Sequence, residues 1–189
     1  MPHSRAELVQ YYRWLRQYGL NDSHSGNASI RKENMVWVTP TGCCADTLKA
    51  TDLISCKIGE NPPPTASADA RLHLAVYASN STAKAILHGH NPYTIALTFD
   101  TTEFVPIDFE GHYYSLTVPV VVLDYPHLMQ ESPAQVAKIL TNQSLAIVRG
   151  HGVYAQATTL NLAYKWLCSL ELSAKIAYLA RQPKAIITG

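Results

Sequence analysis

The chain has 189 residues, of which 47% are hydrophobic and 15% charged, and its formal net charge at pH 7 is +1. This length fits one domain, residues 1–189, with a core large enough to need no disulfide or structural metal. The charge balance does not indicate a nucleic-acid partner, and the sequence has no Lys/Arg-rich block. No apolar run is long enough to span a bilayer. The four cysteines lack C-x-x-C spacing, which favours reduced thiols. We therefore expect a cytoplasmic protein that binds neither nucleic acid nor membrane.

The N-terminal part of the sequence predicts a helix followed by short strands. Ser4 and Glu7 have the spacing of a capping box, and apolar residues then recur at helical intervals. Ser67 has the character of an N-cap residue for a second helix. The expected elements are a helix between Ser4 and Gly19, strands at 28–31, 35–38 and 53–58, and a helix at 67–77.

The C-terminal part alternates short apolar strands with helices. The expected strands are at 85–87, 118–123 and 145–148. One helix is expected to begin at Pro92, and two further helices are expected at 133–140 and 160–181. This alternation predicts one sheet covered by helices, a single-domain α/β fold with the three layers of an α/β/α sandwich.

Two of the predicted strands end in histidines that could share a metal ion. His88 and His90 lie two residues apart, so their side chains point to the same side of a strand end. His151 lies between glycines after the strand at 145–148, where a tight turn or a close approach is expected. An H-x-H motif alone is weak support, and His151 could instead be a loop histidine bonded to backbone. Three neutral imidazoles would leave open coordination positions, as in a catalytic zinc site.

Six short motifs, in this order and with this spacing, resemble those of the class II aldolase/adducin family. The resemblance extends from the first predicted helix to the last. The fold that it implies has a central, mainly antiparallel sheet. The motifs are Gly26-Asn27-Ala28-Ser29, Thr39-Pro40-Thr41-Gly42, Ser67-Ala68-Asp69, His73-Leu74-Ala75-Val76-Tyr77, His88-Gly89-His90 and His151-Gly152.

The resemblance implies a metal site and a phosphate site. Its metal ligands would be His88, His90 and His151, holding one Zn²⁺ per chain or another divalent transition metal such as Mn²⁺ or Co²⁺. Loop amides and short polar side chains can bind a substrate phosphate without lysines. Ala68 departs from the paired serines of the aldolases, so one phosphate contact is lost or the anionic group differs. The implied phosphate cradle consists of Asn27, Thr41, Gly42 and Ser67.

The acid/base residues are less closely defined by the resemblance. Asp69 stands where the aldolases carry an acid/base glutamate, although it could also be an ordinary first-turn aspartate that favours the helix dipole. The segment 108–114 is expected to be a polar, aromatic loop where family members place a second acid or a tyrosine. Glu110, His112 or Tyr113 would reach the substrate, and the alternative is a surface loop with packed tyrosines.

The activity implied by the resemblance is that of a metal-dependent lyase. It would cleave a C–C bond of a phosphorylated ketose, or of a related hydroxy-carbonyl compound, through a metal-stabilised enediolate, as an aldolase does. The same enediolate would serve a decarboxylase or dehydratase of a sugar acid or sugar phosphate, or a 4-epimerase. A non-enzymatic, adducin-like binding module is disfavoured, because such members lack the metal ligands. The resemblance also implies a homotetramer with active sites at subunit interfaces.

Overall fold

Eight strands form one sheet with the order β3-β2-β1-β4-β8-β7-β6-β5. The computed structural model describes residues 4–115 and 117–182. Neighbouring strands are antiparallel except for β6 and β7, which are parallel. The predicted, mainly antiparallel sheet is therefore confirmed. The strands are β1 (Asn27–Lys32), β2 (Met35–Val38), β3 (Ile54–Lys57), β4 (Ala85–Gly89), β5 (Glu103–Phe104), β6 (Val118–Val121), β7 (Leu145–Val148) and β8 (Gly152–Ala157).

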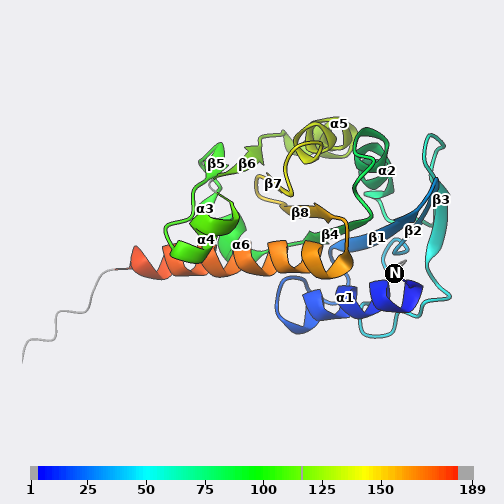
Figure 1. The fold of residues 1–189 in the computed structure, drawn as a ribbon, viewed down its shortest axis with the longest axis horizontal. Coiled ribbons are helices and arrows are strands. Elements are labelled where there is room, and N and C mark those ends of the chain that lie inside the picture. Colours follow the sequence, from blue (N-terminus) through cyan, green and yellow to red (C-terminus); the bar gives the residue numbers. More distant parts are fainter. Residues whose placement is uncertain (1–3, 116, 183–189) are drawn as a thin grey trace, which may run out of the picture.

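Helices cover both faces of this sheet, which confirms the predicted three layers. The helices are α1 (Arg5–Gln17), α2 (Ala70–Ser79), α3 (Pro92–Leu97), α4 (Phe109–Tyr114), α5 (Leu128–Leu140) and α6 (Leu160–Ala180), with a short 3₁₀ turn, η1 (Tyr125–His127), before α5. Figure 1 shows α1 and α6 on one side of the sheet and α2 and α5 on the other. Strand residues alternate accordingly: Leu87 and Ile147 pack in the core beneath α1 and α6, whereas Ile86 and Ala146 pack beneath α2 and α5.

Most of the expected elements are present near their expected bounds. The Oγ atom of Ser4 accepts a hydrogen bond of 3.0 Å from the backbone N–H of Glu7, so the predicted cap of α1 is confirmed. Pro92 opens α3 as expected. The predicted strands at 28–31, 35–38, 53–58, 85–87, 118–123 and 145–148 correspond to β1, β2, β3, β4, β6 and β7, and the predicted helix at 160–181 corresponds to α6.

The predicted N-cap of α2 is wrong. This helix begins at Ala70, with Asp69 rather than Ser67 as its N-cap. The backbone N–H of Ser67 donates to the carbonyl of Thr39 at 3.0 Å. This hydrogen bond between two distant segments of the chain holds the backbone at Ser67 beside Thr39. The helix therefore begins only after this contact.

Some elements of the C-terminal half differ from those predicted by local sequence patterns. The segment 108–114 is not the expected loop, because the side chain of Asp108 accepts a 2.9 Å hydrogen bond from the N–H of Gly111 and caps α4. The helix expected at 133–140 begins at Leu128. The sequence patterns do not predict β5 or β8, and β8 is the strand that borders the histidines described below.

Two further features concern the environment of the chain. Among the described residues, no helix has both the length and the apolar composition that crossing a membrane requires. The four cysteines are free thiols.

Candidate metal centre

The three histidines expected to bind metal lie together at one end of the two central strands. His88 is on β4, His90 follows this strand, and His151 lies in the turn between β7 and β8. Because β4 and β8 are antiparallel neighbours, the end of β4 lies beside the start of β8. One ring nitrogen from each histidine lies within 4.8 Å of the others, and the Nε2 atoms of His88 and His90 are 3.1 Å apart. The tertiary structure thus brings His151 beside two histidines that precede it by 61 and 63 positions in the sequence.

The imidazole of His88 is held in an orientation suited to binding a metal. Its Nδ1 atom lies 3.0 Å from the carbonyl oxygen of Val153, which can only accept a hydrogen bond. Nδ1 therefore carries the proton, and the lone pair of Nε2 faces the other two histidines. The ring of Tyr154 stacks on the face of the His88 imidazole, with 4.0 Å between the ring centroids and 5° between the ring planes.

Burial keeps all three imidazoles neutral at neutral pH. It lowers the pKa of His88 well below the ordinary value for histidine, and the pKa values of His90 and His151 also lie below that value because of burial. Neutral imidazole is the form that binds a metal ion. The donor set therefore fits one divalent transition-metal ion with coordination positions left open.

The turn that carries His151 needs a close backbone approach at Gly152. A Cβ atom there would lie 2.5 Å from the carbonyl oxygen of Gly89 and 2.8 Å from Cε1 of His88. A second support is Asn21, whose Nδ2 donates to the carbonyl of His88 at 3.3 Å and whose Oδ1 accepts from the N–H of His90 at 2.9 Å. No local sequence signal singles out Asn21, because its role depends on residues 67 positions away or more.

Asp69 points toward the histidines instead of capping its own helix. It is the N-cap of α2, yet its side chain makes no capping hydrogen bond. Its Oδ2 atom accepts hydrogen bonds of 2.8 Å from both Asn27 Nδ2 and Tyr154 Oη, and lies 3.8 Å from His88 Nε2. Burial raises the pKa of Asp69, whereas the hydrogen bonds donated by Asn27 and Tyr154 lower it, and the pKa lies below its ordinary value. The group is therefore a carboxylate at neutral pH.

Asn27, His88 and Tyr154 form one row across three adjacent strands. Asn27 on β1 lies opposite His88 on β4, and His88 lies opposite Tyr154 on β8. Residues in such a row point to the same face of a sheet, here the face covered by α2. Asp69, at the start of α2, sits against this row. Tyr154 lies on β8, a strand that the sequence patterns do not predict, and its only sequence signal is its position three residues after His151.

The expected phosphate cradle is partly assembled around Asp69. The Oγ atom of Ser67 accepts a 3.3 Å hydrogen bond from the backbone N–H of Asp69, and Asn27 contacts the same residue through its side chain. The segment that carries Thr41 runs alongside, since the N–H of Thr41 donates to the carbonyl of Thr65 at 3.0 Å. Thr41 and the neighbouring glycine, Gly42, are exposed at this edge, and an added Cβ on Gly42 would meet no atom within 4 Å.

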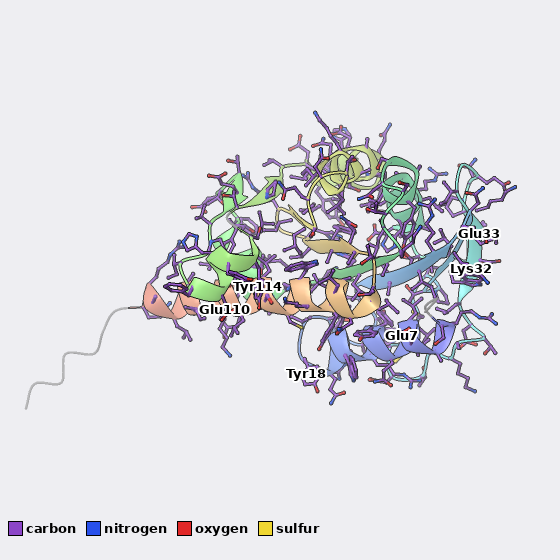
Figure 2. The ribbon with its side chains drawn as sticks, viewed as in Figure 1. Glu7, Tyr18, Lys32, Glu33, Glu110 and Tyr114 are labelled. Carbon is purple, nitrogen blue, oxygen red and sulfur yellow. The ribbon has the colours of Figure 1, made fainter. Side chains whose placement is uncertain are left out.

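The other expected acid/base residues lie on α4 and are exposed. Tyr113 is 82% exposed, and Glu110 and His112 are exposed as well. Helix α4 packs against α6, and Figure 2 shows Glu110 and Tyr114 beside that helix. In the ranges 4–115 and 117–182, no hydrogen bond joins Glu110, His112 or Tyr113 to the three histidines or to Asp69. A single chain does not bring these residues into contact with the metal centre.

Comparison with known proteins reveals relatives with several different activities. A protein of Methanococcus vannielii named L-fuculose phosphate aldolase is 25% identical, over 82% of this chain and 84% of that protein. A 3-oxo-tetronate 4-phosphate decarboxylase of Haemophilus influenzae is 29% identical over 90% and 85%. A methylthioribulose-1-phosphate dehydratase of Citrobacter koseri is 26% identical over 87% and 89%.

Structural similarity and a family sequence model cover nearly the whole chain. The crystal structure of L-fuculose-1-phosphate aldolase from Thermus thermophilus superimposes with a TM-score of 0.85, covers 92% of both chains and is 29% identical. The model of the family described as Class II Aldolase and Adducin N-terminal domain matches residues 6–178. The chain therefore belongs to the class II aldolase/adducin family.

Proposed function

We propose that this protein is a metal-dependent lyase in which His88, His90 and His151 hold one divalent cation per chain, Zn²⁺ or else Mn²⁺ or Co²⁺. The observation that carries this proposal is the convergence of three buried or half-buried, neutral imidazoles within 4.8 Å, with a carboxylate beside them. When bound, the cation would supply Lewis-acid stabilisation of the negative charge that develops on the substrate oxygens. Neutral ligands leave that cation its full charge.

Asp69 is the proposed acid/base. Its carboxylate lies 3.8 Å from a histidine of the cluster and is ionised at neutral pH, so it can accept a proton. It would take up and return the proton that the substrate exchanges at a hydroxyl group or at the carbon freed by bond cleavage. The residue is only 8% exposed, so bulk water has little access to compete for that proton.

The proposed substrate is a phosphorylated ketose or a related hydroxy-carbonyl compound. Its phosphate would bind in the cradle formed by Asn27, Thr41, Gly42 and Ser67. The hydrogen bonds that join Ser67 and Asn27 to Asp69 support this proposal, because a phosphate held by these residues would lie next to the proposed base. Such a position would leave the reacting carbons between the phosphate and the histidines.

The leading reaction is aldol cleavage of a C–C bond. Decarboxylation or dehydration of a sugar acid or sugar phosphate is the second candidate, and it is favoured by relatives of similar identity that carry those names. Epimerisation at C4 is the third. All of these reactions would use the same cation and base, so substrate binding decides between them. A non-enzymatic binding module has no evident use for the three converging histidines.

A second acid would come from α4 of a neighbouring subunit in a homotetramer, with active sites at the subunit interfaces. This is supported by the exposure of apolar side chains on α4 and α6, since large exposed apolar patches mark interaction surfaces. These side chains include Phe109, Tyr113, Leu172, Ile176 and Leu179. Mixing inactive His88→Ala and Tyr113→Phe variants should restore part of the activity, because hybrid interfaces contain one intact site. No recovery after subunit exchange would contradict shared sites.

The direct test is a substrate panel. Metal-loaded protein would be incubated, at neutral pH as in the cytoplasm where we place it, with phosphorylated ketoses and sugar-acid phosphates. Mass spectrometry would detect a released aldehyde, CO₂ or loss of water. The expected result is turnover of at least one phosphorylated compound that disappears in the His151→Ala variant. Turnover retained without the histidine would contradict the proposed function.

A further inference from the structure

Beside the three histidines, two hydrogen-bond donors converge on one oxygen atom of Asp69. Asn27 Nδ2 and Tyr154 Oη each donate to Oδ2 at 2.8 Å. A carboxylate oxygen has about two lone-pair sites, so these donors occupy both sites of Oδ2. Within the described part of the chain, Oδ1 accepts no hydrogen bond. The carboxylate thus presents only Oδ1 for other partners.

Released from these donors, the carboxylate would be close enough to bind a metal ion. Zn–N and Zn–O bonds are about 2.0–2.2 Å long, so two ligands of one ion lie roughly 3–4 Å apart, and Oδ2 is already 3.8 Å from His88 Nε2. Three histidines leave a coordination position open. Despite this, Asp69 is not a member of the cluster whose ligand atoms lie mutually within 4.8 Å. The hydrogen bonds to Oδ2 hold the carboxylate at the edge of the cluster.

The two donors are themselves rigidly placed. Asn27 and Tyr154 flank His88 in the row across β1, β4 and β8, and their side chains are buried, with 5% and 1% of each residue exposed. The ring of Tyr154 is fixed by its stacking on His88. The donors and the histidine are therefore packed against one another in the interior.

We propose that Tyr154 and Asn27 are positioning residues that keep Asp69 beside the metal ion as a base and prevent it from becoming a fourth ligand. This inference rests on the metal-dependent function proposed above and assigns a role to Tyr154, a residue outside the six family motifs. The expected effect on metal affinity is opposite to the usual one. Loss of a group that supports a metal site ordinarily weakens metal binding by about 10–100-fold, whereas loss of the Tyr154 hydroxyl should strengthen it, because it frees an anionic ligand.

The test is a double-mutant cycle of Tyr154→Phe and Asp69→Asn, read by metal binding. Tyr154→Phe keeps the stacked ring and removes only the hydroxyl. Chelator competition would give the Kd for Co²⁺, and the visible spectrum of bound Co²⁺ reports its coordination number. We expect the Kd of Tyr154→Phe to fall below that of the wild type, with weaker visible absorption as a ligand is added. In the double variant both changes should vanish, because Asn at position 69 supplies no charge.

A matched control is Tyr77→Phe. Tyr77 is as buried as Tyr154, and its hydroxyl is hydrogen-bonded to Ser29, outside the cluster of His88, His90 and His151. This variant should bind Co²⁺ with the Kd and the spectrum of the wild type. If Tyr154→Phe does not fold, Asn27→Ala removes the other donor and should shift the Kd in the same direction.

The outcomes separate this inference from the proposed function. A wild type that binds no Co²⁺ at the three histidines would overturn the proposed function. A wild type that binds Co²⁺, with Tyr154→Phe unchanged or weaker in affinity, would overturn the positioning role alone. Tighter binding that persists in the double variant would also overturn it, since Asp69 would not be the added ligand.

Discussion

The ring of Tyr154 lies parallel to the imidazole of His88, 4.0 Å away, and its hydroxyl donates to Asp69. One side chain thus touches both a candidate metal ligand and the candidate base. The imidazole of His88 also stacks with His151, at 4.9 Å between centroids and 24° between planes. His88 is therefore confined by two rings, and its Nδ1 is fixed by the carbonyl of Val153. Such confinement favours a preorganised ligand, because little side-chain freedom remains to be lost on metal binding.

The first prediction concerns metal content. Purified wild-type protein should contain one divalent ion per chain, and His88→Ala and His151→Ala should lose both the metal and activity, because two imidazoles hold such an ion far less tightly than three. Elemental analysis after dialysis measures this. His127→Ala is the control, since His127 is exposed on η1. Full metal occupancy in His151→Ala would exclude the three-histidine site.

The second prediction concerns Asp69. Asp69→Asn keeps the shape of the side chain and removes its basicity, so kcat should fall by about 10²–10⁴-fold. Metal content should stay at the wild-type level, because the carboxylate is not a ligand. Steady-state kinetics and elemental analysis on the same preparation check both points.

The control for this change is Asp100→Asn, an exposed aspartate. Wild-type turnover in Asp69→Asn would place the base elsewhere, with Glu110 or His112 next. Loss of the metal would instead make Asp69 a ligand. Asp69→Glu should retain partial activity if the pocket accepts a longer side chain.

The third prediction concerns the phosphate cradle. Thr41→Val preserves the side-chain shape and removes a hydroxyl at the exposed edge of the site. The loss of one hydrogen bond to a charged group is worth about 1.5–3 kcal/mol, so KM should rise about 10-fold or more while kcat changes little. Inorganic phosphate should compete with the substrate. Thr47→Val, in an exposed turn outside the site, is the control. Equal turnover of a non-phosphorylated analogue would show that phosphate is not recognised.

The fourth prediction concerns stability and pH. His73 lies on α2 and is fully buried, its Nδ1 is hydrogen-bonded to Ser29, and burial lowers its pKa to about 4. The unfolded chain has the ordinary pKa of about 6.5 and binds the proton first as pH falls. Stability from this group is therefore complete above pH 6.5 and is lost between pH 6.5 and 4. At pH 5 the loss amounts to about 2 kcal/mol, from 1.36 kcal/mol per pKa unit.

Urea unfolding of metal-free protein at pH 7.5 and pH 5 measures this effect. The variant His73→Gln has no titrating group at this position and should lose about 2 kcal/mol less free energy of unfolding between the two pH values. All other ionisable groups are the same in the two proteins, so the difference isolates His73. Equal losses in the two proteins would show that His73 does not stay neutral in the folded state.

The sequence by itself determined the cap of the first helix, most of the strands and the three histidines that converge. Ser4 with Glu7 predicts the start of α1 because capping involves residues three positions apart. His88 and His90 are recognisable because side chains two positions apart share a side of a strand. The cap and the pair His88 and His90 depend on short-range geometry, which a sequence pattern carries directly, whereas His151 joins that pair only through the family resemblance.

Only the tertiary structure decided how the carboxylate of Asp69 is held and where the residues of α4 lie. Asn27, His88 and Tyr154 become neighbours through the register of three strands, and no local pattern encodes a register between residues 61 and 66 positions apart. The backbone at Ser67 likewise depends on its bond to Thr39, which overrides a favourable N-cap residue. The physical reason is that such contacts are chosen by the packing of whole layers, because a polar group is satisfied by whichever partner the buried sheet and helix bring within reach.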